Sequence, residues 1–339
     1  MTGFCDIIGQ EPVTRVLKNA VRTGKIPHAI IFDGEKGCGK KTLAKAFAAA
    51  CSCEALQDNA GEGPEPCGKC HSCIMAENGS HPDIITVTHE KNAIIAVDEI
   101  RAQVVNDVQI KPYYGGRKIY IIPDAHLMTH QAQNALLKTL EEPPGYVVIL
   151  LLADNKDLLL PTLLSRSVCL SFIPVERENI LKILSKNGIP VSGREDISSI
   201  VSYARGNPGR ALFLSNSEKF ADFWKDSLQI LKGVRKMTDR EISSAAAKIA
   251  ANRKERGENL SDYLTLFLLW YRDIMYLKAD GGEDKLIFPE EAAFLRRAGE
   301  EYSFEKLNGI IEGIKEAGSY LDSNVQPEST FELLFMKMR

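Results

Sequence analysis

The chain has 339 residues, and its 42 lysines and arginines against 45 aspartates and glutamates give a formal net charge of −3. With 44% apolar and 26% charged residues, and glycine and proline near their average share, the composition excludes collagen-like and largely disordered chains. The negative net charge argues against a protein that binds nucleic acid by itself. Such proteins usually carry a surplus of basic residues, because their affinity comes largely from neutralising phosphates. Any contact with DNA is therefore expected to be local or shared.

Neither a membrane span nor a secretion signal is expected. The longest purely apolar run, residues 147–153, has seven residues, whereas a membrane-spanning helix needs about 20. The first residues contain no basic segment followed by an apolar one, which a signal peptide requires. We therefore expect a cytoplasmic protein, and the length suggests two or three domains.

Strand-like apolar runs alternate with helical patterns over the first 170 residues or so. The predicted strands are 29–32, 84–88, 118–122 and 147–152, and the predicted helices are 40–51, 97–108 and 129–142. Strands that alternate with helices predict a parallel sheet that is covered on both faces.

Beyond Pro174 the strand-like runs stop and helical spacing takes over. The predicted helices there include 178–185, 197–204, 210–214, 263–277 and 304–321. We expect three domains, namely an α/β domain at 1–173 with a cysteine-rich insert at 51–73, a small helical lid domain at 174–217, and an all-α bundle at 218–339 that serves oligomerisation.

A phosphate-binding loop is predicted where the first strand meets the following helix, because the segment has the pattern GxxxxGK. Gly34, Gly37 and Gly39 allow backbone N–H groups to converge on phosphate oxygens. The helix N-terminus adds partial positive charge, and Lys40 adds a full one. A chance glycine-rich turn is the alternative explanation.

The groups that would hold Mg²⁺ and activate water are altered. Lys41 stands where a serine or threonine hydroxyl usually binds the metal, and Thr42 follows one residue later. At the end of the 118–122 strand, Pro123 and Asp124 take the places of two acidic residues. We therefore expect ATP binding to be possible, Mg²⁺ binding to be doubtful, and intrinsic hydrolysis to be absent or weak.

A metal site is predicted in the cysteine-rich insert. Cys67, Cys70 and Cys73 are spaced as CxxCxxC, and a fourth thiolate would complete a closed tetrahedral zinc site without an open catalytic position. We choose Cys53 as the fourth ligand, and Cys51, which fits inside the preceding helix pattern, is the alternative. The zinc is expected to be structural.

Several motifs together resemble the bacterial clamp loader subunits of DNA polymerase III. They are IGQ at 8–10, the strand entry at 28–29, the loop at 34–40, the cysteine insert, NALLKTLEEPP at 134–144 and SRS at 165–167. The likeness covers nearly the whole chain. Pro123 and Asp124 in place of an acidic pair, and GNPG at 206–209 in place of a sensor arginine turn, resemble delta prime rather than the motor subunit gamma/tau.

The resemblance implies an AAA+-type, non-motor subunit of a hetero-oligomeric ring. Its expected partners are gamma/tau-type and delta-type subunits, with the sliding clamp and primed DNA reached through the complex, while polymerase chemistry belongs to another subunit. Arg166 is expected to act in trans on the ATP bound by a neighbour. An ordinary exposed arginine, or one in an intramolecular salt bridge, is the plainer reading. The alternative functions are an active gamma/tau-like motor that uses Thr42 and Asp124, and a degenerate P-loop protein that binds ATP only to lock its fold.

Overall fold

The computed structural model of the chain describes residues 3–58, 63–89, 94–114, 116–191, 197–256, 259–323 and 325–339. Its contacts divide into two compact units. The first unit comprises Met1–Gly188 with Arg205–Arg210, and the second comprises Ile189–Ala204 with Ala211–Arg339. The domain boundaries predicted at 173 and 217 stay predictions.

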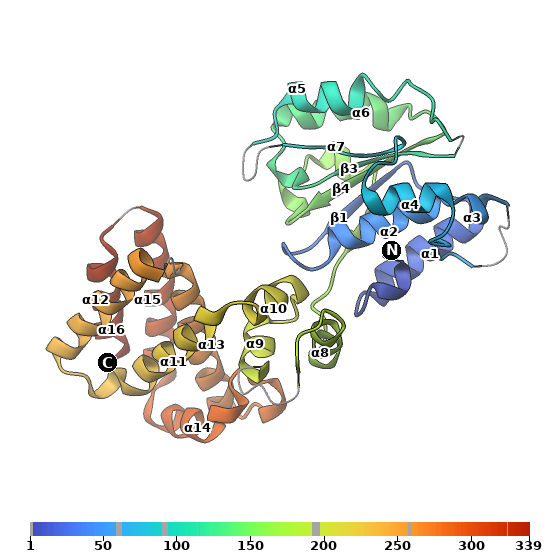
Figure 1. Cartoon of the computed structure of the whole chain (residues 1–339). Helices are drawn as coiled ribbons and strands as arrows, with labels where there is room; N and C mark the ends of the chain where they lie inside the picture. The colour runs from blue at the N-terminus through green and yellow to red at the C-terminus, as the bar shows by residue number, and fades with distance from the viewer. Residues whose placement is uncertain are drawn as a thin grey trace. The chain divides into compact units, whose positions relative to one another are not determined.

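A parallel sheet forms the centre of the first unit (Figure 1). Its strands are β1 (Ala29–Asp33), β2 (Ile84–Thr86), β3 (Lys118–Ile122), β4 (Val147–Ala153) and β5 (Val168–Ser171), in the order β2-β3-β4-β1-β5. Strands β3 and β4 are buried along their whole length. Their nearly unbroken apolar sequences follow from this burial, since both faces of a covered parallel sheet must be apolar.

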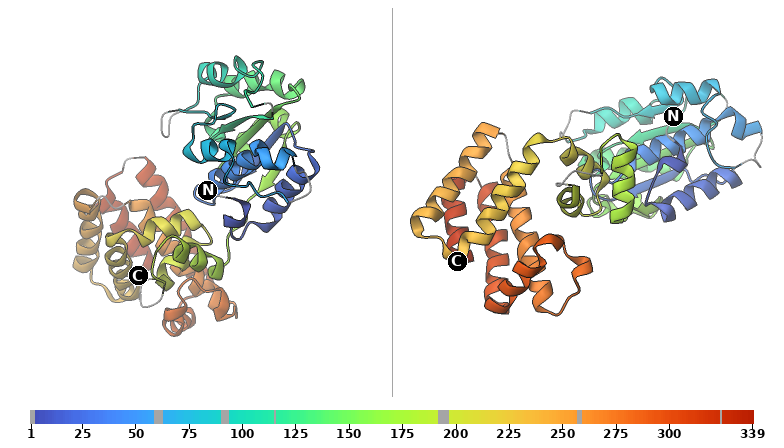
Figure 2. Two further views of the ribbon diagram at one scale, coloured as in Figure 1. Left: turned by 45° about the vertical axis from the view of Figure 1, so that its right-hand side comes forward. Right: turned by 60° about the horizontal axis from the view of Figure 1, so that its bottom comes forward.

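Helices cover both faces of this sheet (Figures 1 and 2). The helices of this unit are α1 (Glu11–Thr23), α2 (Lys40–Ser52), α3 (Glu54–Asp58), α4 (His71–Asn78), α5 (Val97–Ile100), α6 (His130–Glu141), α7 (Pro161–Leu164) and α8 (Arg177–Lys186). Helices α1 and α2 pack on one face, around Leu17 and Phe47. Helices α5 and α6 pack on the other, around Ile100 and Leu136.

The structure departs from the predicted elements in several places, and helices α1, α3 and α4 have no counterpart in the prediction. Strand β5 has no counterpart in the prediction, because it is a short edge strand in which only Leu170 is buried. The predicted helix 97–108 is α5 followed by a π-helix at Arg101–Val105. The buried side chains Ile100, Val104 and Val108 follow one another there at intervals of four.

The second unit is helical. Its helices are α9 (Ile197–Ala204), α11 (Glu218–Gly233), α12 (Asp239–Arg256), α13 (Leu260–Lys278), α14 (Ala292–Glu301), α15 (Phe304–Asp322) and α16 (Pro327–Met338), while α10 (Pro208–Ser215) begins in the first unit and ends in the second. Helix α13 is buried on most sides, and its Tyr263 and Phe267 pack edge to face on Phe331 of α16. The predicted fold class, a P-loop-type parallel sheet followed by helical domains, is confirmed.

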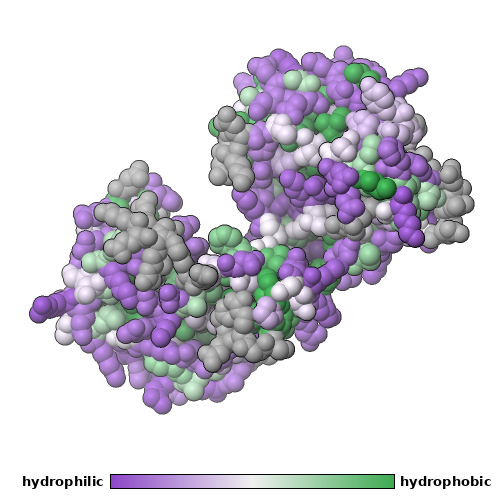
Figure 3. Space-filling view, in the orientation of Figure 1, coloured by the Kyte–Doolittle hydropathy of each residue, from purple (hydrophilic) through white to green (hydrophobic). Residues whose placement is uncertain are grey.

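Short 3₁₀ turns connect several elements, at Phe4–Asp6, Ala125–Leu127, Lys156–Leu158, Val234–Lys236, Glu283–Lys285 and Pro289–Glu291. On the face shown in Figure 3, hydrophilic residues predominate and apolar ones form small patches. Among the described helices, none has the combination of length and apolarity that crossing a membrane requires.

Candidate nucleotide and metal sites

The glycine-rich loop lies at the carboxyl end of β1 and leads directly into α2, as its sequence predicts. Gly34, Gly37 and Gly39 all have positive φ angles, of 157°, 93° and 103°. Only glycine adopts such angles without strain. Gly39 is the N-cap of α2, and Lys40 is the first residue of that helix. The loop therefore has the backbone form that a phosphate site at a helix N-terminus needs.

Lys40 is already fully engaged by the protein itself. Its Nζ donates to the carbonyl oxygens of Gly34 and of Glu35, the latter at 3.0 Å, and forms an ion pair of 2.9 Å with Oδ1 of Asp154. The Lys40 side chain is only 8% exposed. A phosphate that enters the loop must therefore compete with a carboxylate for this lysine.

A cavity of about 310 Å³ lies beside the loop. Its walls include Lys41 and Thr42 from α2, Pro123 and Asp124 from the end of β3, and Asp154 from the end of β4. Lys41 and Thr42 are both exposed. All predicted nucleotide-binding residues except Gly34 line this cavity, so the structure brings them together. The absence of a hydroxyl at position 41 and of a carboxylate at position 123 leaves the cavity poorly suited to Mg²⁺.

Asp124 is held in a position that requires unusual backbone geometry. Its φ angle is 49°, in the left-handed region that non-glycine residues seldom adopt. Oδ2 of Asp124 lies 3.6 Å from Nε2 of His89, whose side chain is 6% exposed. The carboxylate is therefore directed toward a neighbouring histidine.

Carboxylates and an imidazole meet at the same sheet edge, since Asp124, His126 and Asp154 place ligand atoms within 4.8 Å of one another. Nδ1 of His126 accepts a hydrogen bond of 3.2 Å from the backbone N–H of Asp154. In the neutral ring this bond leaves the proton on Nε2, where a metal would need a lone pair. Together with the commitment of Asp154 to Lys40, the bond makes this group a poor metal site.

The segment 206–210 closes over the loop from outside. The side chain of Asn207 donates to the carbonyl of Lys36 at 2.8 Å, and the backbone N–H of Gly209 donates to the carbonyl of Gly37 at 2.9 Å. A Cβ atom on Gly209 would lie 2.7 Å from the Cα of Gly37, so backbone meets backbone here. Arg210 lies 3.9 Å from the carboxylate of Glu35. Arg210, which directly follows the GNPG segment at 206–209, is therefore at the rim of the loop.

Arg166 lies between α7 and β5, at the edge of the α/β unit. In the isolated chain it forms an ion pair of 2.9 Å with Glu141 and donates to the carbonyl of Thr162 at 3.2 Å. Its side chain remains 37% exposed. The intramolecular salt bridge, which the sequence analysis gave as the alternative explanation of Arg166, is thus present. An exposed pair of this kind is worth only about 0 to 1 kcal/mol, so Arg166 can exchange it for another partner.

The four predicted cysteine ligands come together. The sulfur atoms of Cys53, Cys67, Cys70 and Cys73 lie within 4.8 Å of one another. Cys53 caps the C-terminus of α2, and Cys70 is the N-cap of α4. Two helix ends therefore present the thiols to a common centre, and this donor set suits tetrahedral zinc.

Backbone N–H groups point at these sulfur atoms as they do in thiolate sites. The N–H of Cys67 donates to Sγ of Cys53 at 3.4 Å, and the N–H of Cys70 donates to Sγ of Cys67 at 3.3 Å. N–H groups of residues 69 and 70 lower the pKa of Cys67 to about 6. Cys51, the alternative ligand, lies outside the cluster. The geometry therefore favours Cys53.

The cysteine cluster is also tied to the rest of the unit. The Ser72 hydroxyl donates to the carbonyl of Ser52 at 2.6 Å and lies 2.8 Å from Nε2 of the buried His81. Glu65 accepts from the backbone N–H of Phe4 at 2.9 Å and forms an ion pair of 2.8 Å with Lys18. The insert is thus a packed part of the α/β unit.

Sequence reasoning missed Asp154 and gave His126 and Asn207 no role. The available signal for Asp154 was its place directly after β4, because the carboxyl ends of neighbouring parallel strands converge at one sheet edge. For Asn207 the signal was weaker, since its partner Lys36 is 171 residues away in sequence.

Comparisons with known proteins agree with this architecture. A family model described as "DNA polymerase III, delta subunit" matches residues 9–176. The tau subunit of DNA polymerase III from Bacillus subtilis is 28% identical over 99% of this chain, which spans 61% of that protein. The delta prime subunit from the same organism is 26% identical over 97% of this chain and 96% of its own length.

A solved gamma subunit-related protein of DNA polymerase III from Thermotoga maritima is similar over 95% of this chain and 98% of its own, with a TM-score of 0.39 and 18% identity. The sequence matches extend from the phosphate loop through the cysteine cluster to the helical unit. The chain belongs to the family of DNA polymerase III clamp loader subunits that includes delta prime and gamma/tau.

Proposed function

We propose that this chain is a delta prime-like stator of the clamp loader, which hydrolyses ATP slowly or not at all and supplies Arg166 to the ATP site of a neighbouring subunit. In this role it helps a ring of gamma/tau-type and delta-type subunits to load a sliding clamp onto primed DNA. Zinc held by the four cysteines would be structural.

The state of the phosphate loop is the observation that carries the non-motor part of the proposal. Lys40 pairs with Asp154, Lys41 replaces the hydroxyl ligand, and Pro123 replaces an acid. Each change removes part of the charge arrangement that stabilises phosphoryl transfer. Nucleotide binding without turnover is compatible with this arrangement.

Arg166 carries the trans part of the proposal. It is exposed at the edge of the unit, and its pair with Glu141 is weak enough to exchange. A guanidinium keeps its charge at all relevant pH values and can bind phosphate oxygens through two N–H groups. These properties match an arginine that stabilises phosphate transfer on another chain.

The test uses the complex assembled with gamma/tau-type and delta-type subunits. We expect Arg166→Ala to remove most DNA-stimulated turnover at the one site it serves, since such an arginine contributes about 10³ to 10⁵ in rate. Arg101→Ala, another exposed arginine in a salt bridge, is the matched control, and Glu141→Gln should preserve activity. Undiminished turnover with Arg166→Ala in a normally assembled complex would reject the role.

An active motor of the gamma/tau type is the second candidate, because Thr42 and Asp124 both line the cavity and could replace the missing hydroxyl and acid. The purified chain alone distinguishes the two. Turnover of about 1 per second, as in ordinary enzymes of this type, would favour the motor. ATP binding without turnover, combined with stimulation of partner subunits, would favour the stator.

A further inference from the structure

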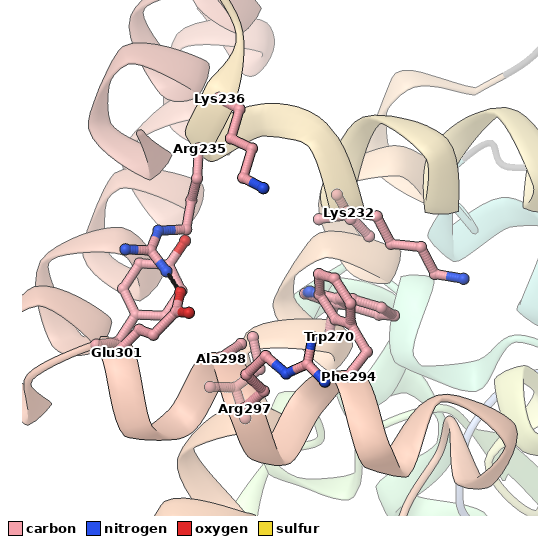
Figure 4. A pocket seen from close by; sticks show the side chains of 11 residues that line it. Lys232, Arg235, Lys236, Trp270, Phe294, Arg297, Ala298 and Glu301 are labelled. Carbon is pink, nitrogen blue, oxygen red and sulfur yellow. Dashed lines mark hydrogen bonds and ion pairs between the residues drawn. The ribbon is translucent and has the colours of Figure 1, made fainter.

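A basic pocket of about 320 Å³ lies in the helical unit, far along the chain from the phosphate loop and the cysteines (Figure 4). Helices α11, α13 and α14 and the turn Val234–Lys236 supply its walls. Its lining residues are Leu231, Lys232, Arg235, Lys236, Trp270, Ile274, Phe294, Arg297, Ala298, Glu301 and Tyr302. They include four cations and only one carboxylate.

The floor of the pocket is aromatic. Trp270 is 1% exposed and lies 5.7 Å from the ring of Phe294, which is 37% exposed at the rim. The guanidinium of Arg235 lies over the ring of Tyr302, at 4.6 Å from its centre, and pairs with Glu301. A cavity of this size is at the lower end of ligand sites, which span about 300 to 1,000 Å³, and it suits one large apolar or aromatic side chain.

The four basic side chains of the pocket differ in whether a carboxylate of the same chain pairs with them. Lys232 pairs with Glu291, and Arg235 pairs with Glu301. Lys236 and Arg297 have no ion-pair partner within the described segments of the chain, and both are exposed. Figure 4 shows Lys236 reaching in from one side and Arg297 from the opposite side, beside Trp270 and Phe294. Two separate positive charges therefore flank the aromatic floor.

We propose that this pocket binds an acidic peptide segment of another protein, which inserts an aromatic side chain and places carboxylates on Lys236 and Arg297. The charges sit on opposite rims, as they would for carboxylates spaced along an extended chain on both sides of an anchor residue. Arginine binds a carboxylate through two parallel hydrogen bonds, and aromatic anchors in closed pockets carry much of the energy of such interfaces.

A nucleic-acid strand fits this surface less well. Acidic residues adjoin the pocket residues in sequence, with Glu290 before α14 and Glu300 near its end, while Asp239 after the turn pairs with Arg339. The basic residues that line the pocket therefore do not extend along the chain as an unbroken basic run. Electrostatic binding to nucleic acid needs a continuous basic track, whereas a short acidic peptide needs only the pocket and its rims.

The experiment measures binding of a fluorescein-labelled peptide, with two aspartates on each side of one phenylalanine, to the full-length chain by fluorescence anisotropy. We expect Lys236→Gln combined with Arg297→Gln to weaken binding by about tenfold or more, the effect of losing charged hydrogen bonds. Lys306→Gln on α15, an exposed lysine outside the pocket, should change affinity by less than about twofold. A peptide with alanine in place of phenylalanine should bind at least about fivefold more weakly.

A second variant, Phe294→Leu, keeps an apolar side chain at the rim. It should weaken binding of the phenylalanine peptide more than binding of the alanine peptide. The proposal is wrong if the peptide does not bind saturably, if the double variant binds it as well as the parent chain, or if Lys306→Gln weakens binding equally. It is also wrong if single-stranded oligothymidylate binds with the same dependence on Lys236 and Arg297 while the peptide does not.

Discussion

Asp154 would compete with the phosphates of a nucleotide for Lys40, because its carboxylate already forms an ion pair with this lysine. Removing that negative charge should both free Lys40 and reduce repulsion of phosphate. We expect Asp154→Asn to strengthen ATP binding by about tenfold, measured by titration calorimetry in the absence of Mg²⁺. Asp157→Asn, an exposed aspartate three residues later, is the control, and an unchanged or weaker affinity with Asp154→Asn would contradict the competition.

His81 makes the α/β unit sensitive to mild acid. Its Nδ1 accepts from the backbone N–H of Asp83 at 3.0 Å, and Nε2 must donate to Ser72, whose own hydroxyl proton goes to Ser52. Burial holds the pKa of His81 below its ordinary value of 6.5. Because the unfolded chain takes up this proton more readily, stability is fully present above about pH 6.5 and falls as the pH drops toward the lowered pKa.

The matched variant is His81→Gln, whose amide can donate to Ser72 and accept from Asp83 without titrating. Urea unfolding at pH 7.5 and at pH 5 should show that the parent chain loses more stability on acidification than the variant does. Equal losses in the two proteins would mean that His81 is not responsible.

At the residue scale, the sequence predicts candidate sites where the residues are close together in the chain. The spacing of Cys67, Cys70 and Cys73 and the glycines of the phosphate loop point to two such sites without knowledge of the fold. Asp154 was not predictable in the same way, because its partner Lys40 lies 114 residues away. Only the adjacency of β4 and β1 brings the two charges together.

The cysteine cluster includes one thiol from the C-terminal end of α2, that of Cys53. If zinc binds there, Cys53→Ser should lower the metal content, which is expected to be about one zinc per chain in the parent protein, and should destabilise the α/β unit. Cys51→Ser, a change in a neighbouring buried cysteine, should keep the metal. Mass spectrometry of the native protein measures both. Retention of zinc by the Cys53 variant with loss in the Cys51 variant would reverse the assignment.

At the element scale, β3, α6 and β4 were predicted well, whereas the amphipathic helix α1 was not predicted. Strand β3 has the predicted bounds, and α6 and β4 differ from prediction by about one residue at an end. Edge strand β5 was not predicted, because an exposed edge strand needs few apolar residues. The π-helix at residues 101–105 was not predicted, because its apolar residues keep the spacing of an ordinary α-helix. Such details depend on how an element packs against its neighbours.

Within the described residues, each of the two units has its own buried interior, on both faces of the sheet in the first and around α13 in the second. Leu150, in β4, and Phe331, in α16, are both fully buried in their own units. We expect calorimetry to resolve two unfolding transitions. Leu150→Ala and Phe331→Ala should each destabilise one unit by about 2 to 5 kcal/mol and leave the other transition in place.

Two outcomes would contradict independent cores. A single transition that both substitutions lower equally would indicate one cooperative unit. Loss of both transitions after either substitution would indicate that neither unit folds alone.

The order of sheet and helical parts was predictable from the sequence at this scale, because the change from alternating to purely helical patterns near residue 174 is marked. The basic pocket was not, since its cations come from a helix end, a turn and another helix more than 60 residues further on. Packing alone gathers them around Trp270.

Glu65 links the cysteine cluster to the beginning of the chain, since it accepts from Phe4 and pairs with Lys18 on α1. Metal bound by the neighbouring thiols would stabilise the segment that carries this carboxylate and, through Glu65, its contacts with Phe4 and with α1. A reporter dye placed on the outer side of α1 would therefore register occupancy of the metal centre from a distance of some 50 positions in sequence.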